Sequence, residues 1–214
     1  MNGYVRIKCI TLRGDGTYLI RVETGNQSGS EELEFIIIRE IIDELDLVSG
    51  EAPCEVLPVL ERGAKLTAAY ASACSSFAFS QSSLKALHRK LLTKGFSREI
   101  AQDAIELIRD RGFVDEDAIA VRRAEIMIAK LWGKTRILSK LREEGFPNCS
   151  IEEVFEYLEN VDFIHNCILV IEKKYGDIPE ERKEREKMYA ALSRMGYSSS
   201  EIKAAVKRIF EEQP

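Results

Sequence analysis

The sequence is poor in the residues that most often bind metals or form disulfides. Its 214 residues include only two histidines, His88 and His165, and five cysteines. The cysteines are odd in number and scattered, without a C-x-x-C pair, so we expect neither a disulfide framework nor a zinc site. This cysteine usage indicates a protein of the reducing cytoplasm.

Long apolar stretches are also missing. No apolar run approaches the roughly 20 residues that a membrane-spanning helix requires. The first 20 residues mix charged, polar and apolar side chains, and they lack the apolar core of a signal peptide. We therefore expect no membrane partner.

The residue groupings of common enzyme sites do not appear. Gly133-Lys134-Thr135 resembles the end of a phosphate-binding loop, but Ile128 stands where that loop requires its first glycine. The acidic run 115–117 fits a helix start, where carboxylates cap the free N–H groups and complement the helix dipole. Neither H-x-x-x-H nor G-x-S-x-G occurs. We therefore predict that the protein is not an enzyme and uses no cofactor and no metal.

The charge is distributed unevenly along the chain. Residues 1–62 carry 6 basic and 12 acidic side chains, and residues 143–214 carry 10 and 16. Residues 84–142 carry 14 basic against 8 acidic side chains, an excess of +6 in a chain whose net charge is −5. A basic middle can contact nucleic acid or an acidic protein, or it can simply solvate the outer faces of helices.

The first 62 residues indicate a small module that contains β-structure. Residues 4–10 alternate with a period of two, residues 13–16 supply turn residues, and residues 18–22 resume the alternation, which predicts a β-hairpin. Residues 24–30 are rich in Gly, Ser and Asn and predict a loop, and residues 35–37 predict a short third strand. Residues 38–45 follow helical spacing, which ends near Gly50.

A three-fold internal repeat dominates the rest of the chain. Two apolar residues four positions apart precede a glycine and an aromatic residue in each copy, and the glycines are 50 and 51 residues apart. The copies are Leu87-x3-Leu91-x3-Gly95-Phe96, Ile137-x3-Leu141-x3-Gly145-Phe146 and Met188-x3-Leu192-x3-Gly196-Tyr197. A glycine that ends a helix in the left-handed region, followed by an aromatic residue that contacts the last turn, is a Schellman ending. The repeat therefore predicts three equivalent helix ends.

A second helix follows each ending. Ser97 supplies an N-cap in the first copy, while Ser150 with Glu153 and Ser198 with Glu201 have the spacing of a capping box. A third helix follows Asp115 in the first copy and Asp162 in the second.

The predicted fold is mainly α, with tandem three-helix repeats in an elongated array behind the small β-hairpin-containing module. We place the N-terminal module at 1–62, a linker helix at 63–82, and the repeats at 83–133, 134–178 and, incomplete, 179–214.

A DNA-reading helix-turn-helix is an alternative interpretation of each repeat. The helices in the recognition position argue against it. The helix after Ser150 exposes Glu152, Glu153, Glu156 and Glu159, which would repel phosphates.

Residues 83–210, about three fifths of the chain, resemble the bacterial RecX family, the modulators of the RecA recombinase. The likeness rests on the ordered set of motifs Ser83-x3-Leu87-x3-Leu91-x2-Lys94-Gly95, Gly112-Phe113-Val114-Asp115-Glu116-x2-Ile119-Ala120, Gly133-x2-Arg136-Ile137-x3-Leu141-x3-Gly145-Phe146 and Leu192-x3-Gly196-Tyr197. The leading module is similar to the N-terminal extension of some members.

This resemblance implies a regulatory role in homologous recombination, DNA repair and the SOS response. RecX-like proteins bind RecA, lie along the groove of its filament on single-stranded DNA, and restrain strand exchange and ATP hydrolysis. We expect a monomer whose basic middle faces RecA or its bound DNA, through Arg89, Lys90, Arg122, Arg123, Lys130, Lys134, Arg136 and Lys140. Two alternatives stay open, namely a sequence-independent DNA-binding protein that acts without RecA and a scaffold for an unrelated partner.

Overall fold

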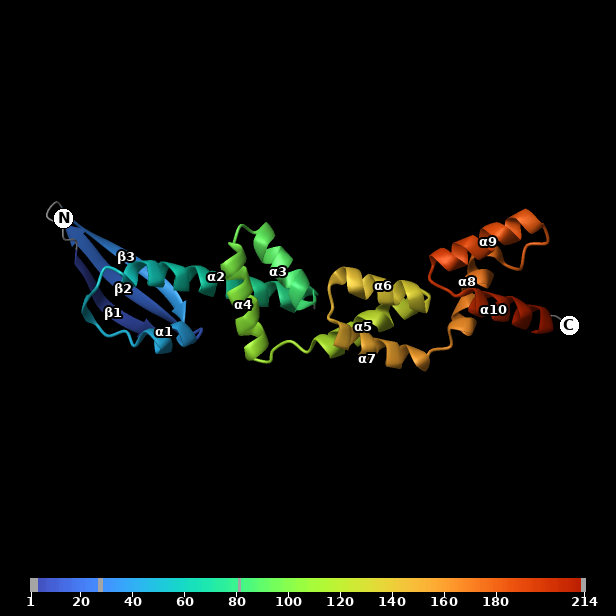
Figure 1. Cartoon of the computed structure of the whole chain (residues 1–214), viewed down its shortest axis with the longest axis horizontal. Helices are drawn as coiled ribbons and strands as arrows, with labels where there is room; N and C mark the ends of the chain where they lie inside the picture. Colours follow the sequence, from blue (N-terminus) through green and yellow to red (C-terminus); the bar gives the residue numbers. More distant parts are fainter. Residues whose placement is uncertain (1–3, 27–28, 81, 213–214) are drawn as a thin grey trace. The chain divides into compact units, whose positions relative to one another are not determined.

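The computed structural model of the chain describes residues 4–26, 29–80 and 82–212. These residues form four strands and ten helices, so the predicted fold class is confirmed (Figure 1). The strands are β1 (Tyr4–Leu12), β2 (Thr17–Asn26), β3 (Gly29–Ile38) and β4 (Gly50–Ala52). The helices are α1 (Arg39–Leu45), α2 (Val56–Ser80), α3 (Leu84–Thr93), α4 (Arg98–Asp110), α5 (Glu116–Ala129), α6 (Lys134–Glu144), α7 (Asn148–Glu159), α8 (Phe163–Tyr175), α9 (Arg182–Arg194) and α10 (Ser199–Glu212).

The chain forms two compact units. The first comprises Met1–Ser80 and Leu87–Phe113, and the second comprises Gln81–Ala86 and Val114–Pro214. Helix α2 runs through the predicted boundary at residue 62 without a break. Where the chain divides into domains stays a prediction.

The N-terminal strands form one antiparallel sheet in the order β3-β2-β1-β4. The predicted hairpin is confirmed, since β1 pairs with β2 from Tyr4 opposite Gly25 to Leu12 opposite Tyr18. The third strand is longer than predicted, because β3 pairs with β2 along ten residues, beginning with Gly29 opposite Asn26. The predicted loop over 24–30 is therefore wrong at both ends, and its centre, residues 27–28, lies outside the described residues.

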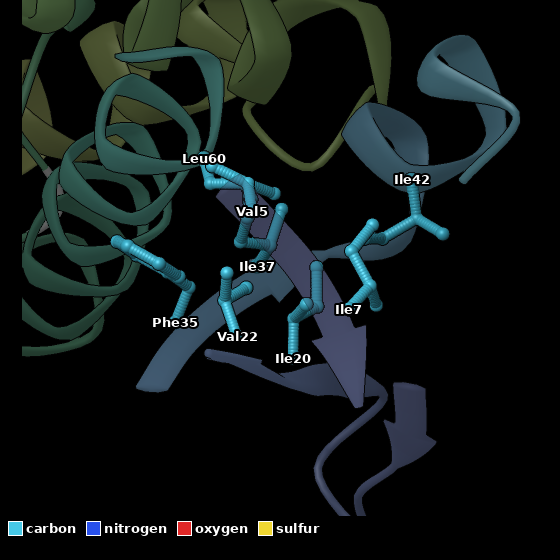
Figure 2. Close-up of a cluster of buried hydrophobic side chains, with 8 residues drawn as sticks. All are labelled: Val5, Ile7, Ile20, Val22, Phe35, Ile37, Ile42 and Leu60. Carbon is cyan, nitrogen blue, oxygen red and sulfur yellow. The ribbon is translucent and has the colours of Figure 1, made fainter. Parts of the chain in front are cut away.

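One face of the sheet builds the core of the first unit (Figure 2). Each of β1, β2 and β3 supplies two side chains, and α1 and α2 supply one each: Val5, Ile7, Ile20, Val22, Phe35, Ile37, Ile42 and Leu60. These apolar residues recur every second position in each strand, so they share one face. Figure 1 shows α2 covering the sheet and continuing to α4, against which it also packs.

Two residues of α2 let the helix approach the sheet closely. Gly63 lies so near β3 that a Cβ there would be 3.2 Å from the Ile37 side chain. One turn later the buried Thr67 hydroxyl accepts a 2.9 Å hydrogen bond from the Ile38 amide and donates one to the Gly63 carbonyl. The last N–H of β3 is thereby satisfied by the helix that covers it.

The remaining helices pack in sets of three. Helix α5 contacts α6 and α7, and α10 contacts α8 and α9. The packed sets are therefore α5–α7 and α8–α10. Each set begins one helix before the matching copy of the sequence repeat, whose copies start with α3, α6 and α9. With this count the last set is complete, although the sequence alone left the third repeat without its third helix.

The three predicted helix endings are confirmed. The amides of Phe96, Phe146 and Tyr197 each donate a 3.2 Å hydrogen bond to the carbonyl of the leucine five positions earlier. Gly95, Gly145 and Gly196 have φ values of +92°, +92° and +96°. Both features define the Schellman motif, in which a residue without a Cβ takes the left-handed position.

The predicted N-caps are confirmed in part. Ser97 and Asp115 accept hydrogen bonds from the amides three residues on, and Ser198 exchanges both bonds of a capping box with Glu201. The capping box at Ser150 is wrong, because α7 already begins at Asn148. The buried Ser150 hydroxyl instead donates a 2.6 Å bond to Asp117 on α5.

Candidate interaction surface

The N-terminus of α6 is held against the C-terminus of α9 in a backbone joint. The Gly133 amide donates a 2.8 Å hydrogen bond to the Met195 carbonyl, and the Thr135 amide donates a 3.2 Å bond to Gly196. A Cβ on Gly133 would overlap the carbonyl group of Gly196 and the amide nitrogen of Tyr197. The joint therefore joins the free N–H groups of one helix to the free carbonyls of another, which is the favourable alignment of two helix dipoles.

Tyr197 completes this joint from the other side. Its buried hydroxyl donates a 2.8 Å hydrogen bond to the Leu131 carbonyl, just before α6. Burial raises the pKa of the Tyr197 phenol, and the nearby Cys167 and Glu201 raise it further. Burial likewise raises the pKa of the Cys167 thiol to about 12.

A similar contact recurs one repeat earlier in the second unit. Ser83 precedes α3 as Gly133 precedes α6, and its hydroxyl donates a 2.7 Å bond to the Glu144 carbonyl at the end of α6. A Cβ on Gly145 would lie 3.0 Å from the Lys85 side chain, whereas a Cβ on Gly95 would meet nothing within 4 Å. Gly145 and Gly196 thus each end one helix and also contact the first turn of another, whereas Gly95 does not.

The eight predicted contact residues belong to both units. Arg89 and Lys90 lie on α3 in the first unit, where Lys90 donates a 2.9 Å hydrogen bond to the Ser80 hydroxyl. The other six lie on α5, on α6 or between them in the second unit. We describe these six as the α5–α6 basic surface: Arg122, Arg123, Lys130, Lys134, Arg136 and Lys140.

Three members of the α5–α6 basic surface are bound to carboxylates. Arg123 makes a two-pronged ion pair with Glu144, with distances of 2.6 and 3.1 Å. Lys134 pairs with Glu159 and lies 3.6 Å from the centre of the Phe155 ring, and Lys140 pairs with Glu143 at 3.1 Å. Arg123 and Lys134 therefore stabilise the packing of α5, α6 and α7, and they are less available to a partner than their sequence suggests.

Arg122 faces a hollow of acidic character on α5. The hollow has a volume of about 560 Å³, and its lining includes Asp115, Asp117, Glu125 and Glu153 beside Arg122. The Tyr157 hydroxyl donates a 3.3 Å hydrogen bond to Glu125. Partial burial, followed by the charge of Glu125, raises the pKa of Tyr157. This side of α5 therefore presents negative charge around a single arginine.

Lys130 and Arg136 remain as the exposed cations of the surface. Both are solvent-exposed, and within the described residues neither makes an ion pair. The Arg136 guanidinium lies over the Trp132 ring, 3.9 Å from its centre. Trp132 is the one tryptophan of the chain and is half-buried. These residues form the part of the surface that is most open to a partner.

Metal-binding groups and membrane-spanning helices are both missing from the described residues. These residues contain no group of three or more His, Cys, Asp or Glu side chains placed to hold a metal ion, and they include no helix long and apolar enough to cross a membrane. The amides of Gly133 and Thr135 are taken up by α9, so the sequence Gly133-Lys134-Thr135 cannot wrap a phosphate as a nucleotide-binding loop does.

Comparison with known proteins finds similarity to RecX proteins along most of the chain. A family model of RecX, its third three-helix domain, matches residues 162–206, which span most of α8–α10. The regulatory protein RecX of Halorhodospira halophila is 27% identical over 146 residues, which cover 68% of this chain and 90% of that protein. The RecX protein of Pelodictyon phaeoclathratiforme is 29% identical over 124 residues, which cover 56% and 76%. The family model and the curated relatives therefore support the RecX family that the sequence motifs resemble.

Solved structures agree with this assignment in fold. A crystal structure of regulatory protein RecX matches with a TM-score of 0.73 at 18% identity, and the match covers 97% of this chain and all of that one. RecX from Lactobacillus salivarius matches with a TM-score of 0.58 at 14% identity, over 69% of this chain and 97% of that one. The RecX relatives are named regulatory proteins, which supports the prediction that the chain is not an enzyme.

Three features of the surface escaped the sequence analysis. The Gly133–Gly196 joint connects residues 63 positions apart, and the stack of Arg136 on Trp132 lies partly between helices, where no period signals it. The carboxylate partners of Arg123 and Lys134 stand 21 and 25 positions away. One signal was available, because Gly133 and Ser83 occupy the same small-residue position of the repeat.

Proposed function

We propose that this protein binds RecA on single-stranded DNA and lowers the ATPase and strand-exchange activities of the filament. The observation that carries the proposal is similarity to a RecX protein over two thirds of this chain and nearly the whole length of that relative. The curated relatives share the name of a regulatory protein, and a modulator of RecA is the function that this similarity supports.

The contact is proposed to lie on the α5–α6 basic surface, centred on Lys130 and Arg136. These two cations are exposed and make no ion pair within the described part of the chain, whereas Arg123 and Lys134 already serve the packing of α5–α7. A cation that must first break an ion pair gains less from a new partner. Arg122 sits among carboxylates, and Arg89 and Lys90 on α3 stay candidates of lower rank.

The Gly133–Gly196 joint supports this assignment. It fixes the first turn of α6, from which Arg136 projects, because the amides of Gly133 and Thr135 are bonded to α9. A surface that is held rigid before binding costs less conformational entropy when the partner binds.

The test is RecA-dependent ATP hydrolysis on single-stranded DNA, titrated with this protein. Regulation of the filament predicts inhibition at amounts well below those of RecA and of the DNA sites. Inhibition that appears only when the protein saturates the DNA would instead favour a DNA-binding protein that competes with RecA. Absence of inhibition, together with unchanged strand exchange, would contradict the proposal.

A direct contact with DNA is the second candidate. It is favoured by the exposed cation–aromatic pair of Arg136 and Trp132. Binding to single-stranded DNA alone, with a steep dependence on salt, would report such contacts.

A further inference from the structure

We propose that Trp132 and Arg136 form a stacking platform for a base of single-stranded DNA. The inference deepens the proposed function and rests on it for its biological setting, because RecA assembles on this form of DNA. It assigns a nucleobase, in addition to phosphates, as the group that the α5–α6 basic surface recognises.

Arg136 is exposed, which makes its guanidinium accessible to a partner. The guanidinium carbon of Arg136 lies 3.9 Å from the centre of the Trp132 ring, so the guanidinium lies over the ring at contact distance. Arg136 is exposed and, within the described residues, makes no ion pair that would turn its plane toward a carboxylate. A base that stacks on the outer face of the guanidinium would extend an indole–guanidinium–base stack, as Arg planes and aromatic rings do in single-strand recognition.

The platform is also fixed in place. The Arg136 amide donates a 3.1 Å bond to the Gly133 carbonyl, in the turn that Met195 and Gly196 hold from α9. A Cβ on Gly196 would lie 2.5 Å from the Cβ of Arg136, so the backbone just after α9 lies directly against the base of this side chain. The backbone of Trp132 is held as well, because its amide donates a 3.1 Å bond to the Met127 carbonyl at the end of α5.

The contrast with Lys134 shows what is particular to Arg136. Lys134 also lies over an aromatic ring, that of Phe155, but its ammonium is paired with Glu159. An ammonium is a point charge without a planar face, and here it is already neutralised. Of these two cation–aromatic pairs on α6, only that of Arg136 combines an open plane with an uncompensated charge.

A nucleic acid fits this platform better than an acidic peptide does. A carboxylate binds the edge of a guanidinium through paired hydrogen bonds, and it gains little from the stacked face. A single-stranded nucleotide uses both parts, because its base takes the face while a phosphate is drawn to the edge and to the exposed Lys130 nearby in sequence. Binding of an acidic peptide is therefore the competing outcome, and the experiment tests it with poly-glutamate.

The experiment uses the emission of Trp132 in the full chain, which carries no other tryptophan. Excitation at about 295 nm avoids the tyrosines, and the probes are oligo(dT) and an oligonucleotide of equal length whose residues are abasic. Stacking predicts saturable quenching by oligo(dT), with a dissociation constant about tenfold lower than that for the abasic strand, the effect of one stacked base. Equal affinity for the two strands would overturn the platform and leave only phosphate binding.

The matched variants are Arg136→Lys and Lys130→Ala. Arg136→Lys keeps the charge but removes the plane, so the preference for oligo(dT) over the abasic strand should vanish while the salt dependence stays. Lys130→Ala should keep that preference and lower the slope of affinity against salt concentration by about one phosphate contact. A preference that survives in Arg136→Lys would contradict the proposal, as would quenching by poly-glutamate that equals the quenching by oligo(dT).

The outcomes separate this inference from the proposed function. If the parent inhibits RecA but does not distinguish the two strands, the function stands and the platform fails. If it distinguishes the strands but does not inhibit RecA, the platform stands and the function fails. Thermal unfolding of both variants, read by circular dichroism, shows that they are folded, since both side chains are exposed.

Discussion

Gly133 and Gly196 meet backbone to backbone, although 63 positions separate them in the chain. The Gly133 amide bonds to the carbonyl before Gly196, and the space that a Cβ on Gly133 would need is filled by the Gly196 peptide. At Gly133 φ is −77°, an ordinary value for any residue, so glycine is required there by contact and not by backbone conformation.

Gly133→Ala should therefore destabilise the second unit by about 2–3 kcal/mol, the cost of forcing a methyl group against backbone that cannot rotate away. Without the joint, alanine at this helix N-cap would cost less than about 1 kcal/mol. Urea unfolding followed by Trp132 emission measures the difference. The control is Gly14→Ala, where a Cβ meets nothing within 4 Å, and its unfolding midpoint should not move. An unchanged midpoint for Gly133→Ala would show that the joint is not formed.

Tyr197→Phe tests the other side of the joint. Loss of the hydrogen bond to the Leu131 carbonyl should cost about 1 kcal/mol at pH 7. The pKa of Tyr197 is raised above its ordinary value of 10.0, so the folded state disfavours the phenolate and the parent loses stability as the pH rises above about 10. The phenylalanine variant has no such group, and its deficit should shrink between pH 7 and pH 10.5 in the same urea assay. A deficit that grows over this range would be contrary to the assignment.

The sequence predicted the elements whose cause is local. The three Gly-aromatic endings at Gly95, Gly145 and Gly196 follow from one residue in a left-handed conformation and its clasp, and all three are present. The hairpin of β1 and β2 follows from alternation. Strand β4 escaped prediction, because three residues, Gly50–Ala52, are too few to show a period and are held only by pairing with β1.

The contacts between repeats could not be predicted in this way. The first turn of α6 is held by hydrogen bonds to the end of α9, and the Arg123 side chain is held by its ion pair with Glu144. Both contacts depend on a partner that only the packing of the helices brings close. Ser150 shows the same limit, since a serine with capping spacing is used instead to bind Asp117 on another helix. Charge counts identified the basic middle of the chain, but only the packing separates its structural cations from the exposed ones.

Glu40→Gln tests how α1 is tied to the helices of the first unit. Glu40 accepts a hydrogen bond from Arg111, whose other nitrogen donates a 2.6 Å bond to the Tyr70 hydroxyl. Burial opposes ionisation of Glu40, but the bond from Arg111, a backbone hydrogen bond and the charges of Arg111 and Arg39 together outweigh it and lower the pKa below the ordinary value of 4.5. The stability that Glu40 contributes is therefore present above pH 4.5 and is lost as the pH falls through its lower folded value.

The variant should show faster amide hydrogen exchange than the parent over α1 at pH 7. The Glu40 side chain is 42% exposed, so solvent screening limits the effect to less than about 1 kcal/mol. The difference should narrow as the pH falls below 4.5. Asp43→Asn removes an exposed pair with Arg39 in the same helix and serves as the control, with a smaller change expected. Equal exchange rates in Glu40→Gln and the parent at pH 7 would show that the Glu40–Arg111 pair does not stabilise α1.

The most direct measurement of the central claim is RecA-dependent ATP hydrolysis on single-stranded DNA with a charge-reversed surface. The Lys130→Glu/Arg136→Glu variant should need at least about tenfold more protein than the parent for half-inhibition, since each reversal replaces attraction by repulsion at a desolvated contact. The control Lys183→Glu/Lys203→Glu reverses two exposed cations of α9 and α10 and should inhibit as the parent does. Equal inhibition by parent, variant and control would contradict the account that this surface contacts RecA or its DNA.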